Sequence, residues 1–130
     1  MFVHGTCNPA GESGDYVGVY LNDADIDRVV NSGDLIGKPV LLEHQGDGVG
    51  RVVSCWKYNN KLDILVELER EDFLGKLAGS CVASGCVRDF SLGYKMTMSA
   101  NREFGEKRMV EVSLVKKGAR HDCHIKNFAR

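Results

Sequence analysis

The sequence predicts a mainly β domain with short helices, an α+β fold in which strands predominate. Apolar and polar residues alternate in several short runs, as they do in half-buried strands. Turn-forming residues such as Asn59 and Asn60 separate these runs. The 130 residues, 43% of them hydrophobic, are enough to bury one core. Because no linker or internal repeat divides the chain, we expect a single domain over residues 1–130.

The first third of the chain predicts two strands and a helix. Residues 2–5 form a short β-like run, and a polar loop rich in Gly, Asn, Pro and Ser follows over residues 8–14. Residues 16–21 have the β-branched and aromatic composition of a strand. Residues 23–32 place apolar side chains at helical spacing, with acidic residues in the first turn and Gly33 just beyond the end. These features predict a short amphipathic helix that packs on the sheet.

The middle of the chain predicts an antiparallel meander. A Gly-Lys-Pro break at residues 37–39 precedes an apolar run over residues 40–44 that closes on a histidine. The glycine-rich segment 46–48 is expected to be a loop that leads into a strand over residues 49–56. A turn at residues 59–60 leads into the next strand, residues 62–69. Sequential strands joined by such short connections usually pair antiparallel.

The last part of the chain changes period before it returns to strands. Residues 70–87 have helical spacing interrupted by glycines, which predicts one short helix with room for a second. Residues 90–94 alternate as a strand, and residues 103–109, which are charged around a central glycine, predict a hairpin tip. A further strand is expected over residues 109–115. A turn over residues 116–120 and a short final strand or tail near Ile125 and Phe128 complete the chain.

Composition excludes several classes of function. With 17 basic and 18 acidic residues the formal net charge is -1, and no basic run exceeds Lys116-Lys117, so nucleic acid is not an expected partner. No apolar segment approaches the roughly 18–20 residues of a membrane span, and the first residues lack the pattern of a signal peptide. The five cysteines form no CxxC pair, which is typical of reduced thiols in an intracellular protein. We expect no membrane contact and no cofactor.

Three polar residues on apolar strands could form a nucleophilic site: Ser91, His44 and Glu111. A serine hydroxyl becomes a strong nucleophile when an imidazole accepts its proton, and the imidazole works best when a third group fixes its tautomer. Alternation places Ser91 on the face opposite its apolar neighbours. The alternative is a polar strand serine, a histidine that bonds a backbone carbonyl, and a solvated carboxylate. The strand pattern alone does not separate the two interpretations.

Three blocks of sequence go further than composition. They are Asp34-Leu35-Ile36-Gly37-Lys38-Pro39-Val40-Leu41-Leu42-Glu43-His44 with Val49-Gly50-Arg51-Val52, Phe90-Ser91-Leu92-Gly93-Tyr94, and Glu111-Val112-Ser113-Leu114-Val115 with Gly118-Ala119-Arg120. In this order they resemble the capsid maturation proteases, the group of herpesvirus assemblins and tailed-phage prohead proteases. The first resembles the strand that ends in the catalytic histidine. The second resembles the nucleophile strand in its prohead form, and the third the assemblin block H-V-A-L-C followed by G-R-R.

The resemblance implies a role for each matching residue. Ser91 matches the nucleophile and His44 the general base. Glu111 stands where assemblins have a second histidine, and prohead proteases similarly use an acidic third member. Ala119 and Arg120 match the oxyanion turn, in which the first residue gives a backbone N–H and the second orders a water. Such a site contributes about 10²–10³-fold in rate.

Other candidate sites have weaker support in the sequence. Asp89 is expected on the Ser91 face, where it could line a substrate groove. Residues 121–124, His-Asp-Cys-His, contain metal-ligand types, but neighbours on a strand point to opposite faces, so we expect no metal site. Cys81 and Cys86 have no evident basic partner, which argues against a cysteine nucleophile.

The resemblance also implies a fold and a biological setting. The expected fold is a small, closed or nearly closed antiparallel β-barrel flanked by two or three helices. The expected function is that of a procapsid maturation serine endopeptidase, which cleaves scaffold and capsid precursor polypeptides inside the assembling particle. This setting is the host nucleus for a herpesvirus-like protein and the host cytoplasm for a phage protein. A non-catalytic capsid- or scaffold-binding module on the same fold is the alternative. The chain stops ten residues after Arg120, before the helices of the assemblin dimer, so homo-oligomers by that route are not expected.

Overall fold

The computed structural model describes residues 1–9, 21–69, 71–98, 104–117 and 123–129. The elements in chain order are β1 (Phe2–Asn8), α1 (Asp23–Ser32), β2 (Pro39–Leu42), β3 (Gln45–Tyr58), β4 (Lys61–Leu68), α2 (Phe73–Ser84), β5 (Asp89–Met98), β6 (Phe104–Val115) and β7 (Ile125–Ala129). The predicted fold class, mainly β with short helices, is confirmed.

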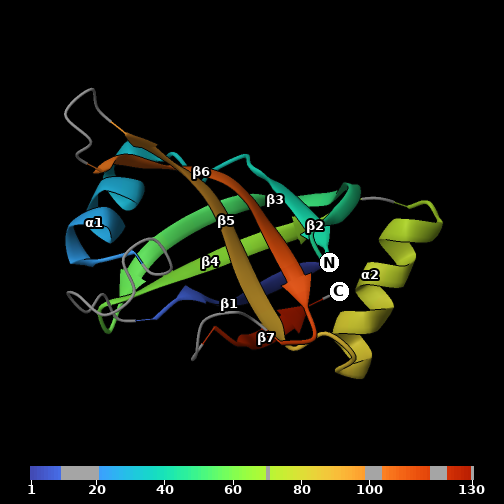
Figure 1. Ribbon diagram of the computed structural model, residues 1–130. Helices are drawn as coiled ribbons and strands as arrows, with labels where there is room; N and C mark the ends of the chain where they lie inside the picture. The colour runs from blue at the N-terminus through green and yellow to red at the C-terminus, as the bar shows by residue number, and fades with distance from the viewer. Residues whose placement is uncertain (10–20, 70, 99–103, 118–122, 130) are drawn as a thin grey trace.

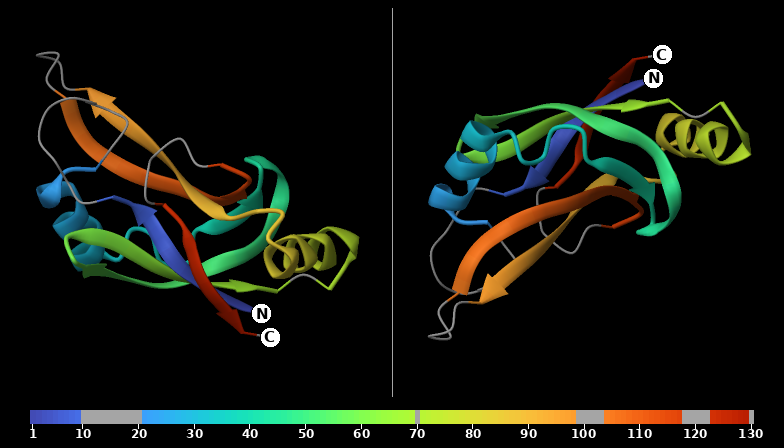
Figure 2. Two further views of the ribbon diagram at one scale, coloured as in Figure 1. Left: turned by 90° about the horizontal axis from the view of Figure 1, so that it is seen from below. Right: turned by 90° about the horizontal axis from the view of Figure 1, so that it is seen from above.

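The seven strands form one sheet in the order β5-β6-β2-β3-β4-β1-β7. The sheet curls until the β5–β6 hairpin lies across β1 and β4, as the views of Figures 1 and 2 show. Its two edge strands approach each other where Asp89 of β5 forms an isolated bridge with His124, next to β7. The Phe90 N–H donates to the Cys123 carbonyl at 2.8 Å, which strengthens this junction. The predicted barrel is therefore a curled half-barrel with its edges in contact at one end.

One pairing departs from the antiparallel prediction. β3 and β4, β1 and β4, β1 and β7, and β5 and β6 all pair antiparallel. β2 pairs antiparallel with β3 but parallel with β6, with Val40 opposite Val112 and Leu42 opposite Leu114. Parallel strands need a long connection between them, and here everything from β3 to β5 supplies it. The parallel pair brings the end of β2 beside the end of β6.

The core fills the inside of the curled sheet. One face of each central strand is apolar, and the fully buried side chains include Val3 of β1, Ile64 of β4, Phe90 of β5 and Leu114 of β6. Phe90 is the largest of the fully buried residues. Burial of a side chain of this size contributes about 1.5–3 kcal/mol. Burial of Phe90 thereby fixes which face of β5 points into the core, so Ser91 next to it must point out of the core.

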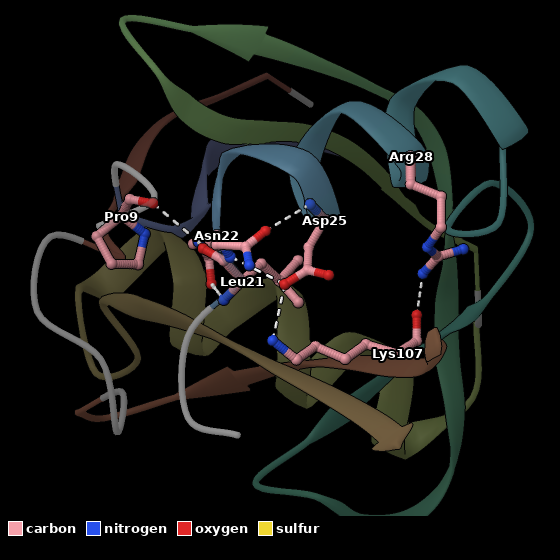
Figure 3. Close-up of polar contacts among 7 residues, drawn as sticks. Pro9, Leu21, Asn22, Asp25, Arg28 and Lys107 are labelled. Atoms are coloured by element: carbon pink, nitrogen blue, oxygen red, sulfur yellow. Dashed lines mark hydrogen bonds and ion pairs between the residues drawn. The ribbon is translucent and has the colours of Figure 1, made fainter. Parts of the chain in front are cut away.

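The two helices lie at opposite ends of the sheet, as Figure 1 shows. α1 covers residues 23–32 as predicted; the Asn22 side chain accepts from the Asp25 N–H, and Gly33 ends the helix in the left-handed conformation. Lys107 of β6 fastens α1 to the sheet: its Nζ lies 2.7 Å from Asp25 Oδ2, and its carbonyl accepts a hydrogen bond from Arg28 (Figure 3). Of the one or two helices predicted within residues 70–87, the described residues 71–87 contain one, α2.

Several predicted boundaries need correction or are not covered. The predicted loop at residues 46–48 is wrong, because β3 begins at Gln45 and the turn from β2 is confined to Glu43 and His44. The predicted hairpin tip at 103–109 is wrong from Phe104 onward, because β6 starts there. The turn at residues 59–60 is confirmed. The strand expected over residues 16–21 lies, except for its last residue, outside the described part of the chain.

Neither helix among the described residues has the length and apolar character needed to cross a membrane.

Candidate active site

Ser91 lies near the start of β5, on its outward face. Phe90 and Leu92 on either side are buried in the core, with exposures of 0% and 4%. Ser91 is itself only 7% exposed, because β6 and the β2–β3 turn lie next to it. The alternation predicted for this strand is thus confirmed, and the hydroxyl is held in a partly covered position on the outer surface of the sheet.

His44 sits at the tip of a tight turn between β2 and β3. Glu43 and His44 both have left-handed backbone conformations, with φ values of 52° and 59°. Each such residue costs roughly 1–2 kcal/mol relative to the right-handed region. Three hydrogen bonds hold the turn against β6: the Glu43 N–H donates to the Leu114 carbonyl (2.9 Å), the His44 N–H to Ser113 Oγ (3.1 Å), and the Lys116 N–H to Glu43 Oε1 (2.9 Å). The parallel pairing of β2 with β6 makes these bonds possible.

The side chains of Ser91, His44 and Glu111 form a continuous hydrogen-bonded chain. His44 Nε2 lies 3.1 Å from Ser91 Oγ, and His44 Nδ1 lies 2.8 Å from Glu111 Oε1. Both distances are within the hydrogen-bond reach of about 2.6–3.2 Å required of a nucleophile and its base. The Glu111 side chain is 11% exposed, whereas that of His44 is 47% exposed. The three predicted residues meet, from three different strands or turns, with the base open to solvent.

Two further residues shape this arrangement, and the sequence analysis missed both. Ser113 Oγ donates to Glu111 Oε2 at 2.7 Å, so each oxygen of the carboxylate has its own partner. Gly93 faces Glu111 in the β5–β6 register, and a Cβ on Gly93 would lie 2.3 Å from Glu111 Oε1. Strand alternation could have identified them. Gly93 follows Ser91 by two positions and Ser113 follows Glu111 by two, which puts each on the same face as a predicted site residue.

Asp89 has a specific partner. Its Oδ1 lies 2.8 Å from His124 Nδ1, and Asp89 is 8% exposed whereas the His124 side chain is 65% exposed. Asp89 lies on the same face as Ser91, as predicted. Its carboxylate, however, is bonded at the junction of β5 and β7. A role for Asp89 in a substrate groove stays a prediction.

The predicted oxyanion residues Ala119 and Arg120 lie outside the described residues. So do His121 and Asp122, half of the His-Asp-Cys-His segment. Within the described ranges, no three His, Cys, Asp or Glu side chains come close enough together to hold a metal ion.

The Cys81 thiol is a poor nucleophile. Burial, and then the neighbouring Cys86 thiol, raise the pKa of Cys81. A raised pKa keeps the thiol protonated, and it is the thiolate that attacks. The hydroxyl of Ser91, in contrast, has the His44 imidazole within hydrogen-bonding distance.

A hollow of about 590 Å³ lies between the end of α2 and β7. Val82, Val87 and Phe128 give it an apolar lining, and His124 contributes to its wall. None of Ser91, His44 and Glu111 lines it. The hydrogen-bonded chain is therefore not part of this hollow.

No protein-family model matches the chain, and no curated protein matches it in sequence. Solved structures do match. One is a crystal structure of the protease of Kaposi's sarcoma-associated herpesvirus (KSHV) in complex with a hexapeptide phosphonate inhibitor. It has a TM-score of 0.60 and 15% sequence identity, over 92% of this chain and 60% of that chain. Another is a room-temperature structure of the same viral protease with an allosteric inhibitor. It has a TM-score of 0.58 and 20% identity, over 95% of this chain and 73% of that chain.

These comparisons identify the fold. At identities of 15–20% the likeness extends to the curled sheet and its helices. The present chain spans about 60% of the length of the first viral protease named above. The likeness is one of fold, and it agrees with the fold that the resemblance of the sequence blocks implied.

Proposed function

We propose that this protein is a serine endopeptidase that acts through a Ser91-His44-Glu111 triad. The observation that supports this most strongly is the hydrogen-bonded chain from Ser91 Oγ through the His44 ring to Glu111, with links of 3.1 and 2.8 Å. The neighbours in fold are viral proteases, and a shared fold by itself does not determine activity. The geometry of the three side chains carries the proposal.

The proposed reaction is acyl transfer in two steps. Ser91 Oγ attacks the carbonyl carbon of the scissile peptide bond while His44 Nε2 takes the hydroxyl proton. The C–N bond then breaks, and His44 returns that proton to the departing amine, which leaves an ester between Ser91 and the acyl half of the substrate. A water molecule attacks this ester while His44 Nε2 takes one of its protons; the C–O bond to Ser91 then breaks, His44 returns the proton to Ser91 Oγ, and the carboxylic acid product is released. Glu111 stabilises the positively charged imidazole that forms in each step.

The exposure of the residues indicates where a substrate can approach. Ser91 and Glu111 are largely covered, but about half of the His44 side chain is open. We infer that the polypeptide substrate lies across the outer surface of the sheet over the β2–β3 turn. Ala119 and Arg120 are proposed as the oxyanion residues, from the resemblance of their segment to the assemblin G-R-R turn.

Scaffold and capsid precursor polypeptides are the proposed substrates, and an assembling viral particle is the proposed location. Both follow from the resemblance in sequence and from the viral proteases among the fold neighbours. The alternative is a non-catalytic capsid- or scaffold-binding module, in which the triad residues are out of alignment. Distances within hydrogen-bond reach argue for the enzyme.

Cleavage of a diverse mixture of synthetic peptides tests this function. The purified protein is incubated with the mixture, and new termini are identified by mass spectrometry. We expect cleavage at a restricted set of sites by the wild-type protein and none by Ser91→Ala, which also reveals the preferred scissile bond. If no peptide is cut, or if Ser91→Ala cuts the same bonds, the proposed function is wrong.

A further inference from the structure

Ser113 occupies a position from which it contacts both the acid and the base of the proposed triad. It lies on β6 two residues after Glu111 and directly opposite Ser91 in the β5–β6 register. It is fully buried, with 0% exposure. Its Oγ accepts from the backbone N–H of His44 at 3.1 Å and donates to Glu111 Oε2 at 2.7 Å. A single side chain thus connects the backbone of the base to the carboxylate of the acid.

The directions of these hydrogen bonds follow from a backbone N–H, which can only donate, and a carboxylate, which can only accept. A backbone N–H can only donate, so the Ser113 oxygen must be the acceptor in its bond with His44. The single hydroxyl hydrogen of Ser113 is then directed to Glu111 Oε2. The other oxygen, Oε1, can also only accept, so His44 Nδ1, 2.8 Å away, carries the ring proton. His44 Nε2 then has a free lone pair, the form of the ring that a general base requires.

The local geometry leaves the Glu111 side chain little freedom to move away from these hydrogen-bond partners. On the β5 side, Gly93 allows the carboxylate to lie where a Cβ would come within 2.3 Å of Oε1. On the β6 side, Ser113 fixes Oε2. The His44 residue has a left-handed backbone conformation, and its N–H points to β6, where it donates to the Ser113 hydroxyl.

We propose that Ser113 is a positioning residue: it holds the Glu111 carboxylate through Oε2, so that Oε1 stays where it accepts from His44 Nδ1 and keeps the ring proton on that nitrogen. This inference rests on the proposed function for its catalytic meaning. The order of the hydrogen bonds, however, is a property of the resting protein and can be measured without turnover.

The test uses Ser113→Ala and Ser113→Cys, which remove the hydroxyl, and Ser113→Thr, which keeps it. Ser54→Ala on β3 is the matched control, because Ser54 is a strand serine that lies opposite Leu65 of β4, beyond the part of β3 that pairs with β2. Circular dichroism establishes that each variant is folded. Cysteine is close to serine in size, so it decides the outcome if the alanine variant does not fold.

Two measurements are made on each folded protein. The first is the proton NMR resonance of His44 Nδ1–H, which a strong bond to a carboxylate moves downfield of the amide region and which His44→Ala assigns. The second is the rate at which a fluorophosphonate probe labels Ser91. We expect the resonance in the wild-type, Ser113→Thr and Ser54→Ala proteins and its loss in the alanine and cysteine variants. Labelling of those two variants should be slower by about 10²-fold, the size of effect that a misplaced catalytic group produces.

The two possible failures are distinguishable. If the wild-type protein is not labelled but its downfield resonance disappears in Ser113→Ala, the proposed function is wrong and the positioning role stands. If the Ser113→Ala and Ser113→Cys proteins keep the resonance and label at the wild-type rate, Ser113 is only a packing residue. Absence of the resonance from the wild-type protein would also overturn the inference.

Discussion

At the scale of single residues, the Glu111 carboxylate has one polar partner for each oxygen: His44 for Oε1 and Ser113 for Oε2. With this arrangement, the contribution of the carboxylate's charge can be tested separately from that of its shape. Substitution by glutamine keeps the shape and removes the charge. The amide oxygen of glutamine would accept from Ser113, which turns its NH₂ group toward His44 and makes it a donor there.

Glu111→Gln should therefore lower kcat more than KM. An NH₂ donor facing Nδ1 favours the ring tautomer with the proton on Nε2, where it cannot accept from Ser91. The expected loss in kcat is about 10⁴-fold, as for the loss of the acid in other triads. The measurement is steady-state kinetics on a peptide found to be cleaved. Unchanged kcat would remove Glu111 from the triad.

Gly93 provides a second test at the scale of a single residue. Gly93→Ala puts a methyl group 2.3 Å from Glu111 Oε1 and 2.9 Å from its Cδ, so the carboxylate must move. We expect fluorophosphonate labelling of Ser91 to slow by about 10²-fold and the free energy of unfolding to fall by about 1–3 kcal/mol.

The matched control for Gly93→Ala is Gly79→Ala on α2. A Cβ on Gly79 has its nearest neighbour, Met1 Sδ, at 3.9 Å, so the methyl group fits. Alanine in a helix is favoured over glycine by about 0.5–1 kcal/mol, so this variant should be slightly more stable and label normally. Equal labelling of both glycine variants would show that the Gly93 contact does not position Glu111.

At the scale of elements, local signals predicted the helices well and the β2–β3 connection badly. α1 has a capping residue, an acidic first turn and a glycine stop, and it covers the predicted residues 23–32. In the β2–β3 connection, the glycines at 46 and 48 suggested a loop. The turn instead uses Glu43 and His44 in left-handed conformations, which bonds to β6 stabilise. Contacts with a strand about 70 residues away leave no local signal.

The capping of α1 gives a prediction at this scale. Asn22→Ala removes the side chain that accepts from the Asp25 N–H at 2.8 Å and should lower the free energy of unfolding by about 1 kcal/mol. Asn22→Asp keeps an accepting oxygen and should change it by only a few tenths of a kcal/mol. Chemical denaturation measures both. Labelling of Ser91 should be unchanged in each, and equal stability of the two variants would show that this cap contributes nothing.

At the scale of the whole molecule, the sequence predicted the strands but not how the sheet is assembled. Ser91, His44 and Glu111 were singled out as separate strand residues and through the resemblance to capsid maturation proteases. Their meeting depends on the parallel pairing of β2 with β6, a contact between segments that are far apart in the chain. Gly93 and Ser113 contact Glu111 through the β5–β6 pairing and within β6, and the β2–β6 pairing adds His44 to these neighbours.

A buried carboxylate on the opposite part of the sheet connects three strands. Asp63 of β4 is 1% exposed and accepts from Thr6 Oγ1 at 2.6 Å and from Lys126 Nζ at 2.9 Å, and it lies 3.2 Å from His4 Nε2. Burial alone would raise the pKa of Asp63. The hydrogen bonds from Thr6, Lys126 and His4 outweigh burial and hold the pKa below its ordinary value. The charged form of Asp63 thereby links β1, β4 and β7.

The lowered pKa predicts how stability depends on pH. A folded-state pKa below the unfolded value of about 3.9 contributes stability at higher pH, and this stability is lost as the pH falls through the folded pKa. Asp63→Asn should lower the free energy of unfolding at pH 6–7 by about 1–3 kcal/mol, because charged hydrogen bonds are lost. The difference in free energy of unfolding between the wild-type and Asp63→Asn proteins should narrow below about pH 4. Urea denaturation from pH 3 to 7 measures it, and a gap independent of pH would contradict this account.

The central claim is that Ser91 is a nucleophile activated by His44. Its most direct test is intact-protein mass spectrometry after incubation with a peptide-like fluorophosphonate, followed by peptide mapping. We predict one adduct per chain, located on Ser91 and absent from both Ser91→Ala and His44→Ala. No adduct on the folded wild-type protein, or an equal adduct on Ser91→Ala, would contradict the claim.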